Sequence, residues 1–252
     1  ANKKYIYSIL NAYVENGFPL TPLEPFLKEG KTEKRGKSLI RECIVVAGKA
    51  SGANILGKTR DRNYSPNIRI VREIIDGVEV VYMYDEDTYY MEGMNEHGVG
   101  IINSALMVLD DEKEKKEKIP TQNGVQIRNA LSYKKLPDCT RALMNYLGGI
   151  NGHTLIGNKT SLYSIESAKE YSPIITKLNP EKGFTIRTNH GEKHPNAGYT
   201  PKGEPDDYLS SKIRKAEAEV ALADVKPNGN SKDYQEVMPS LTTQAFEKDS
   251  NN

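Results

Sequence analysis

The sequence predicts an α+β domain in which antiparallel sheets pack against helices. Apolar runs of strand length alternate with short turns over 38–108, and two helical patterns follow at 121–149. Strand patterns then resume at 152–190, ahead of a last helical stretch at 206–224. Because no internal repeat interrupts this order, we expect one domain of mixed layers.

Three segments differ in composition. The lead segment, 1–42, has apolar residues at helical spacing over 3–17, typical of an amphipathic helix, and a charged stretch with two glycines at 28–37, typical of an exposed linker. The body extends over 43–225, and a polar tail follows at 226–252. We therefore expect the folded domain within the body.

Hairpins account for the first half of the body. Residues 39–61 form a predicted strand pair around the turn KASGAN. A second hairpin is predicted at 67–85, with Asp76 and Gly77 as its turn, since Asp-Gly favours two-residue hairpin loops. Residues 88–108 supply two more strands around another glycine turn.

Helices dominate the middle of the body. The charge run at 110–118 indicates a solvated loop or helix end. Helices are predicted at 121–134 and 138–149, where Asp138 can cap the second one. Cys139 lies in that helix, and we expect it to pack on the apolar face. Later elements are strands at 152–158, 161–168 and 184–190 and a helix at 206–224.

Composition excludes several classes of protein. The chain has 252 residues, with 35 basic and 34 acidic ones, so a net charge of +1 gives no field that favours nucleic acid or an anionic membrane. Two cysteines make neither a disulfide framework nor a thiolate zinc site. No apolar run is long enough to span a membrane. The N-terminal stretch lacks a signal-peptide core, which favours a cytoplasmic protein or one whose signal peptide has been removed.

Cys43 raises the question of function, since it starts an apolar strand 18 positions before Asp61. The simplest interpretation is a buried small hydrophobe. A nucleophilic cysteine needs a base, and His97, His153 and His190 are candidates that the sequence alone cannot place near it. The other candidate is the α-amino group of Cys43 itself, with a pKa of about 7.7–8. That group becomes available only after the preceding peptide bond is cut.

Three stretches around this cysteine form an ordered pattern: CIVVAGKASGANILGKTRD at 43–61, EGMNEHGVGIINSAL at 92–106 and TNH at 188–190. They resemble the N-terminal-nucleophile (Ntn) amide hydrolases, in particular the group of choloylglycine hydrolase, acid ceramidase and penicillin acyltransferase. Members show a nucleophilic cysteine, a strand ending Gly-Arg-Asn-x-Asp, a Gly-x-Asn-Glu-x-Gly turn and a later Thr-Asn. The resemblance covers residues 43 to about 220 and implies a four-layer αββα sandwich of antiparallel sheets.

The resemblance also implies roles for residues near the cysteine. Cys43 would attack an amide carbonyl with its freed amine as base, and Asp61 would hold that amine by a charge-assisted hydrogen bond. A salt bridge with Arg60 or Arg62 is the alternative for Asp61. The turn at 93–98 is expected to be architectural.

Later residues receive supporting roles from the same resemblance. Asn189 would donate its amide to the developing oxyanion, and Asn103 would be another donor, although Ala105 falls nearer the strict position in the bile-salt enzymes. Arg214, in SSKIR, would support the site from the late helix. The alternatives are a turn residue for Asn189 and a surface helix charge for Arg214.

Some positions depart from the family pattern. Lys58 stands where the family has arginine and cannot reproduce the planar fork of a guanidinium. Arg60 or Arg62 could substitute for that arginine, although strand alternation would place them differently. Lys58 and Arg60 are candidates for substrate binding. Ile44 follows the cysteine, where the family often has a small hydroxyl residue.

The expected function is hydrolysis, or acyl transfer, of a linear non-peptide C–N amide bond through a thioester on Cys43. Autocatalytic cleavage between Glu42 and Cys43 would release the nucleophile, and the lead segment 1–42 would be a propeptide. The expected partner is a small-molecule amide substrate; no cofactor, metal or nucleic acid is implied, and a homo-oligomer is compatible with this. The competing interpretation is a catalytically inactive Ntn-derived structural or assembly protein.

Overall fold

The computed structural model describes residues 41–50, 52–62, 67–86, 90–106, 122–144, 150–168, 171–195 and 209–225. The predicted helix at 3–17, the linker at 28–37, the charge run at 110–118 and the tail from 226 lie outside the described residues. The side chains of residues 41, 42, 61, 62, 122, 123, 209 and 210 also lie outside them. The division into a lead segment, a domain and a tail therefore stays a prediction.

A small sheet has the strand order β10-β1-β2. β1 (Arg41–Ala50) and β2 (Ala53–Arg62) form the predicted hairpin, which pairs along its whole length from Arg41 opposite Arg62 to Ala50 opposite Ala53. The short strand β10 (Thr185–Arg187) pairs antiparallel with the other edge of β1. β1 is therefore the central strand, which suits its continuous apolar run.

A large sheet holds seven strands in sequence order, and every neighbouring pair is antiparallel. Its strands are β3 (Ile68–Ile75), β4 (Val78–Asp85), β5 (Tyr90–Asn95), β6 (Gly100–Ser104), β7 (Gly152–Gly157), β8 (Leu162–Ala168) and β9 (Tyr171–Lys177). All but β9 were expected from the sequence. β9 contains Pro173, which cannot donate to a ladder, and its edge position in the sheet tolerates that residue.

Two turns of this sheet follow the sequence prediction. Between β3 and β4, Asp76 (φ 50°) and Gly77 (φ 77°) both have positive φ, as a type I′ hairpin turn requires. Between β5 and β6, Asn95 organises the turn: its Oδ1 accepts from the backbone nitrogens of His97 (3.1 Å) and Val99 (3.0 Å). This supports the architectural interpretation of that turn.

Helices α3 (Gln122–Leu131) and α4 (Leu136–Met144) join β6 to β7. α4 begins at Leu136, so Asp138 is not the capping residue that we expected. It lies instead in the first turn, where a negative charge is favourable near the positive end of the helix dipole. The short 3-10 helix η1 (Pro180–Lys182) precedes β10, and α5 (Leu209–Ala223) is the late helix.

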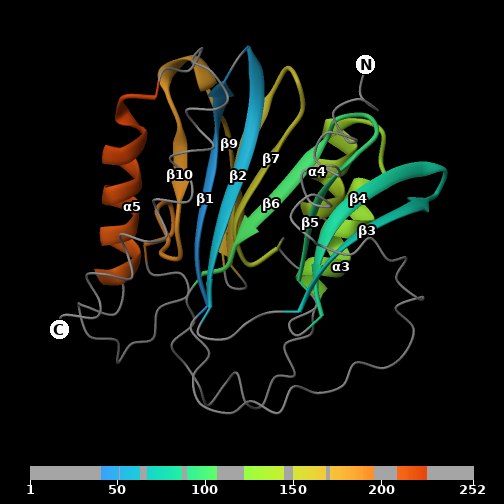
Figure 1. Cartoon of the computed structure of the whole chain (residues 1–252), viewed down its shortest axis with the longest axis horizontal. Coiled ribbons are helices and arrows are strands. Elements are labelled where there is room, and N and C mark those ends of the chain that lie inside the picture. The colour runs from blue at the N-terminus through green and yellow to red at the C-terminus, as the bar shows by residue number, and fades with distance from the viewer. Residues whose placement is uncertain are drawn as a thin grey trace.

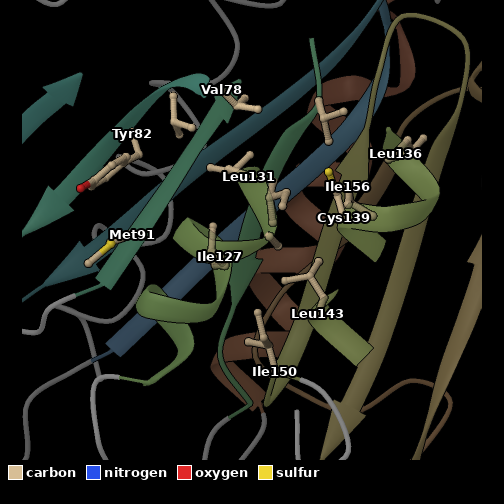
Figure 2. Close-up of a cluster of buried hydrophobic side chains, with 14 of the residues drawn as sticks. Val78, Tyr82, Met91, Ile127, Leu131, Leu136, Cys139, Leu143, Ile150 and Ile156 are labelled. Atoms are coloured by element: carbon tan, nitrogen blue, oxygen red, sulfur yellow. The ribbon is translucent and has the colours of Figure 1, made fainter. Parts of the chain in front are cut away.

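The elements stack in four layers, with α5 beside the small sheet and α3 and α4 on the far side of the large one (Figure 1). Three apolar clusters join the layers. Ile44 and Val46 of β1 pack against α5, while Val45 and Ala47 face the large sheet. The largest cluster lies between the large sheet and helices α3 and α4 (Figure 2). The predicted α+β sandwich of antiparallel sheets is therefore confirmed.

Cys139 belongs to the largest cluster, where its sulfur points among apolar side chains of the helices and sheet (Figure 2). It is fully buried, and burial raises the pKa of its thiol to about 12. Its expected packing role is confirmed. None of the helices in the described part of the chain is long and apolar enough to cross a membrane.

Candidate active site

Cys43 lies near the start of β1, between the two sheets, with 3% of its surface exposed. Side chains alternate along a strand, so Cys43 shares its face with Val45, which packs against the large sheet. The register places Cys43 directly opposite Arg60 and Val45 directly opposite Lys58. The thiol, the guanidinium and the ammonium group therefore belong to one face of the hairpin.

Both polar main-chain groups of Cys43 are held by side chains. Its nitrogen donates to Oδ1 of Asn189 at 2.9 Å, and its carbonyl oxygen accepts from Nη1 of Arg214 at 3.0 Å. Nη2 of Arg214 also donates to Oδ1 of Asn189 at 3.0 Å. The three residues are all buried and come from β1, the end of β10 and α5. The structure thus brings together three of the residues predicted from the sequence.

The end of β10 explains the position of Asn189. β10 pairs with β1 through Val45 opposite Arg187, and its ladder stops there. Continuing this antiparallel register by two residues puts Asn189 across from Cys43. The side-chain oxygen of Asn189 then accepts the hydrogen bond that a ladder carbonyl would have accepted. Arg214 fills the corresponding place as donor to the Cys43 carbonyl.

The amide nitrogen of Asn189 is also engaged. Nδ2 donates to the carbonyl of Ala105 at 2.7 Å and to Oγ of Ser104 at 3.2 Å. Oγ of Ser104 in turn donates to the carbonyl of Thr188 at 2.6 Å. The group of Asn189 that faces Cys43 is therefore its oxygen, while its two N–H bonds are directed at β6 and the residue after it.

Ser211 of α5 supports the Asn189 main chain. Its Oγ accepts from the nitrogen of Asn189 at 2.8 Å and donates to Oγ1 of Thr188 at 3.0 Å. The same Oγ lies 2.9 Å from Nδ1 of His190. Because Ser211 and Arg214 are three positions apart on one helix face, α5 fixes both the backbone and the side chain of Asn189.

Of the three histidines proposed as alternative bases, His97 lies in the turn between β5 and β6, and His153 and His190 lie close to each other. Nε2 of His153 lies 2.7 Å from the carbonyl of His190, and its ring lies 3.7 Å from Glu166. Burial lowers the pKa of His153, and it lowers the pKa of His190 to about 4 even though Glu192 opposes the shift. The described contacts of the His153 and His190 side chains include Glu166, Thr188 and Ser211.

Lys58 makes a buried ion pair with Glu92 of β5. Its Nζ also donates to the carbonyl of Asn103 and lies 4.3 Å from the centre of the Tyr90 ring. Burial lowers the pKa of Lys58, while the charge of Glu92 and the proximity of the Cys43 thiol oppose this. Lys58 thus has a carboxylate, a main-chain carbonyl and an aromatic ring as partners.

Arg60 is the second cation on this face. Nη2 donates to Oδ2 of Asp85 at 2.8 Å, and the guanidinium carbon lies 5.0 Å from the centre of the Tyr90 ring. Nε and Nη1 are buried and have no hydrogen-bond partner among the described residues. Arg60 therefore carries donors that the described part of the chain does not use.

The remaining candidates lie less directly on the site. Asn103 reaches it through its carbonyl on Lys58, whereas its Nδ2 donates to Oγ1 of Thr154 at 2.9 Å. Asp61 is placed by its backbone alone, on the strand next to Cys43 and opposite Glu42. An oxyanion role for Asn103 and an amine-holding role for Asp61 both stay predictions.

Several residues of this cluster were not singled out from the sequence. They are Glu92, Tyr90 and Asp85 on the large sheet and Ser104, Thr188 and Ser211 around Asn189. Glu92 and Asp85 could have been suspected, because charged residues inside apolar strands are rarely buried without a partner. The serines and the threonine have no such signal, since their type is common on any surface.

No family model matches the chain, and no curated protein matches it. Among solved structures, the chain is similar to penicillin V acylase from Agrobacterium tumefaciens, with 12% identity and a TM-score of 0.36. The similarity covers 83% of this chain and 66% of that one. At this distance the activity has to be argued from the site itself.

Proposed function

We propose that this chain is a cysteine amidohydrolase or acyltransferase of the Ntn type, acting on a linear non-peptide C–N amide bond. The observation that carries the proposal is the set of contacts at residue 43. Its nitrogen and carbonyl are held by Asn189 and Arg214, while its side chain lies on the face that carries Lys58 and Arg60. Any buried residue needs partners for its main-chain groups, but a cysteine that serves only as a small core residue does not need two cations on the face of its side chain.

The first step is cleavage of the chain before Cys43. The backbone groups of Cys43 point toward Asn189, so ladder alternation turns those of Glu42 toward β2 and Asp61. The Cys43 thiol attacks the Glu42 carbonyl carbon, the Cys43 nitrogen leaves as an amine with the thiol proton, and a thioester forms. Water then hydrolyses the thioester to the Glu42 carboxylate and a free thiol.

The second step uses the released amine as the base. It takes the thiol proton, and the thiolate attacks the substrate carbonyl. The protonated amine then passes this proton to the leaving nitrogen, which gives an acyl thioester and a free amine product. Water completes hydrolysis, and an acceptor amine completes acyl transfer. Asn189 holds the Cys43 nitrogen through Oδ1, which directs its lone pair, and Asp61 is the proposed charged partner of the protonated amine.

A separate prediction is that Asn189 donates a hydrogen bond to the substrate oxyanion. Its two N–H bonds are directed at Ala105 and Ser104, so a substrate oxyanion would have to take the place of one of them. The contact with Ser104 is the longer of the two, at 3.2 Å. It is therefore the one that a stronger, charged acceptor would displace first.

Intact mass spectrometry of the purified chain tests the first step. We expect fragments of 42 and 210 residues, the lengths on either side of the Glu42–Cys43 bond. Cys43→Ala must abolish them, whereas Cys139→Ala, in the apolar cluster, must leave cleavage unchanged. A thiol-reactive probe must then label Cys43 in preference to Cys139, whose pKa is raised to about 12 by burial.

The same experiment distinguishes the proposed enzyme from the alternative, a catalytically inactive structural protein. A full-length mass that persists through long incubation, without selective labelling at Cys43, would contradict the proposed enzyme. If the fragments form but no amide is hydrolysed, the result would support self-cleavage and contradict the amidase activity.

A further inference from the structure

The side chain of Arg60 is nine-tenths buried, with 10% of its surface exposed. Nη2 donates to the carboxylate of Asp85 at 2.8 Å. Nε and Nη1 are fully buried, and neither has a partner in the part of the chain that the structure describes. A buried donor on a charged group that loses its water without gaining another partner destabilises the folded chain. Such donors therefore indicate an acceptor that the protein itself does not supply.

The surroundings of Arg60 fix its plane and charge. The Tyr90 ring lies 5.0 Å from the guanidinium carbon and 4.3 Å from Nζ of Lys58, so one ring contacts both cations. Burial opposes the charge of Arg60, but Glu92 and Asp85 offset this, and its pKa is raised. The guanidinium is thus charged and is held by the Asp85 carboxylate and the Tyr90 ring. Nε and Nη1 can then donate to a ligand.

The position of Arg60 relates these donors to the nucleophile. Cys43 and Arg60 are directly opposite in the β1–β2 register, and opposite side chains of an antiparallel pair start about 4.5–5.5 Å apart. A ligand atom on the guanidinium is therefore within a few bonds of an atom attacked by the thiol. In the resembling family this position is the variable one of Gly-Arg-Asn-x-Asp, so the arginine is a feature of this chain.

We propose that Arg60 binds a carboxylate of the substrate, placed within a few bonds of the amide that Cys43 attacks. A planar carboxylate matches the planar donors of a guanidinium. The substrate class is accordingly an N-acyl amino acid or a similar amide that carries an acid group. This inference rests on the proposed amidase function for its chemistry and on the Arg60 donors for its binding.

Binding is tested without turnover in the self-cleaved chain after its Cys43 thiol has been blocked by methylthiolation, because Cys43→Ala would leave the Glu42–Cys43 bond uncut. The probes are N-acetylglycine and N-ethylacetamide, which have the same length and differ in the carboxylate. We expect N-acetylglycine to bind at least about tenfold more tightly, measured by calorimetry or thermal shift, since a charge-assisted hydrogen bond contributes about 1.5–3 kcal/mol. Equal binding of the two probes, or no binding of N-acetylglycine, would overturn the proposal. A water molecule on the donors would give that result.

Variants assign the preference to Arg60. Arg60→Gln in the same background must remove the preference for N-acetylglycine, and Arg60→Lys, which keeps the charge without the planar donors, must retain part of it. Arg141→Gln is the matched control, because Arg141 is 69% exposed on α4, and it must change nothing. A preference that survives in Arg60→Gln would place the anion elsewhere and contradict the proposal.

Kinetics of the otherwise unmodified chain separate the inference from the proposed function. Acetate release from the two probes is measured, and we expect kcat/KM at least about tenfold higher for N-acetylglycine, as for its binding. Selective binding without release of acetate would contradict the amidase function and support the carboxylate site. Release of acetate at equal rates from both probes would support the amidase function and contradict the carboxylate site.

Discussion

The main-chain nitrogen of Cys43 and the side-chain oxygen of Asn189 lie 2.9 Å apart, although 146 positions separate the two residues in the chain. Arg214 donates to the same oxygen and to the Cys43 carbonyl. Three segments of the chain therefore meet at one peptide group.

Replacing Asn189 by leucine should lower the free energy of unfolding by about 2–4 kcal/mol. The change leaves the buried Arg214 guanidinium and the Cys43 nitrogen without their shared acceptor, and each unpaired group costs about 1–3 kcal/mol. Urea unfolding measures the loss. Asn129→Ala, on an exposed position of α3, is the control and should stay within about 0.5 kcal/mol of the unmodified chain. A similar value for both variants would show that the contact is unimportant for stability.

The ion pair of Lys58 and Glu92 should be strongly coupled. Lys58→Met leaves Glu92 as a buried carboxylate without its cation and should cost about 3–5 kcal/mol. Glu92→Gln added to Lys58→Met should recover much of this loss, because the unpaired charge is then gone. A double-mutant cycle by chemical unfolding measures the coupling. Additive effects of the two substitutions would contradict a direct pair.

Gly93→Ala should destabilise the large sheet. A Cβ at this position would lie 2.2 Å from the carbonyl oxygen of Val81 and 2.4 Å from Cβ of Tyr82. Neither atom can move without shifting β4, so a cost of about 1–3 kcal/mol is expected, as for overpacking. Gly100→Ala on β6 is the matched control, because its nearest contact is Cδ1 of Leu56 at 3.2 Å. Unfolding midpoints should fall much further for Gly93→Ala.

Stability should fall as the pH falls from about 6.5 to about 4. The pKa of His190 is lowered to about 4 by burial, from an ordinary value of 6.5. The unfolded chain therefore binds a proton in this window while the folded chain does not, and the stability present above pH 6.5 is lost as the pH decreases. His190→Gln should flatten this part of the profile, measured by urea unfolding at several pH values. His153, whose pKa is also lowered by burial, should retain part of the slope in that variant.

Much of the fold was predictable because it follows from local patterns. The Asp76-Gly77 turn, the alternation of β1 and β2 and the apolar face around Cys139 depend on neighbours in sequence. β9 was missed since Pro173 interrupts its strand pattern, and only the edge of a sheet makes that proline acceptable. The predicted start of α4 was two residues too late. Asp138 is a plausible capping residue, but a negative charge is also favourable inside the first turn.

The candidate site divides in the same way. The identities of Cys43, Asn189 and Arg214 came from motifs in the sequence, and the hairpin spacing brought Asp61 onto the strand beside Cys43. The sequence did not say which end of the Asn189 amide faces Cys43. That depended on Ser104 and Ala105, which accept from Nδ2 and leave Oδ1 for the Cys43 nitrogen.

The sequence by itself determined the strands, the helices and the cysteine to consider, because strand alternation, turn chemistry and motif order act between residues close in the chain. Only the tertiary structure decided that Lys58 pairs with Glu92, while two nitrogens of Arg60 have no partner among the residues that the structure describes. Both lysine and arginine occupy the same face of β2, and nothing in their own strand distinguishes them. The difference arises from the packing of the large sheet against that face. Burial there makes a polar group without a partner costly in free energy.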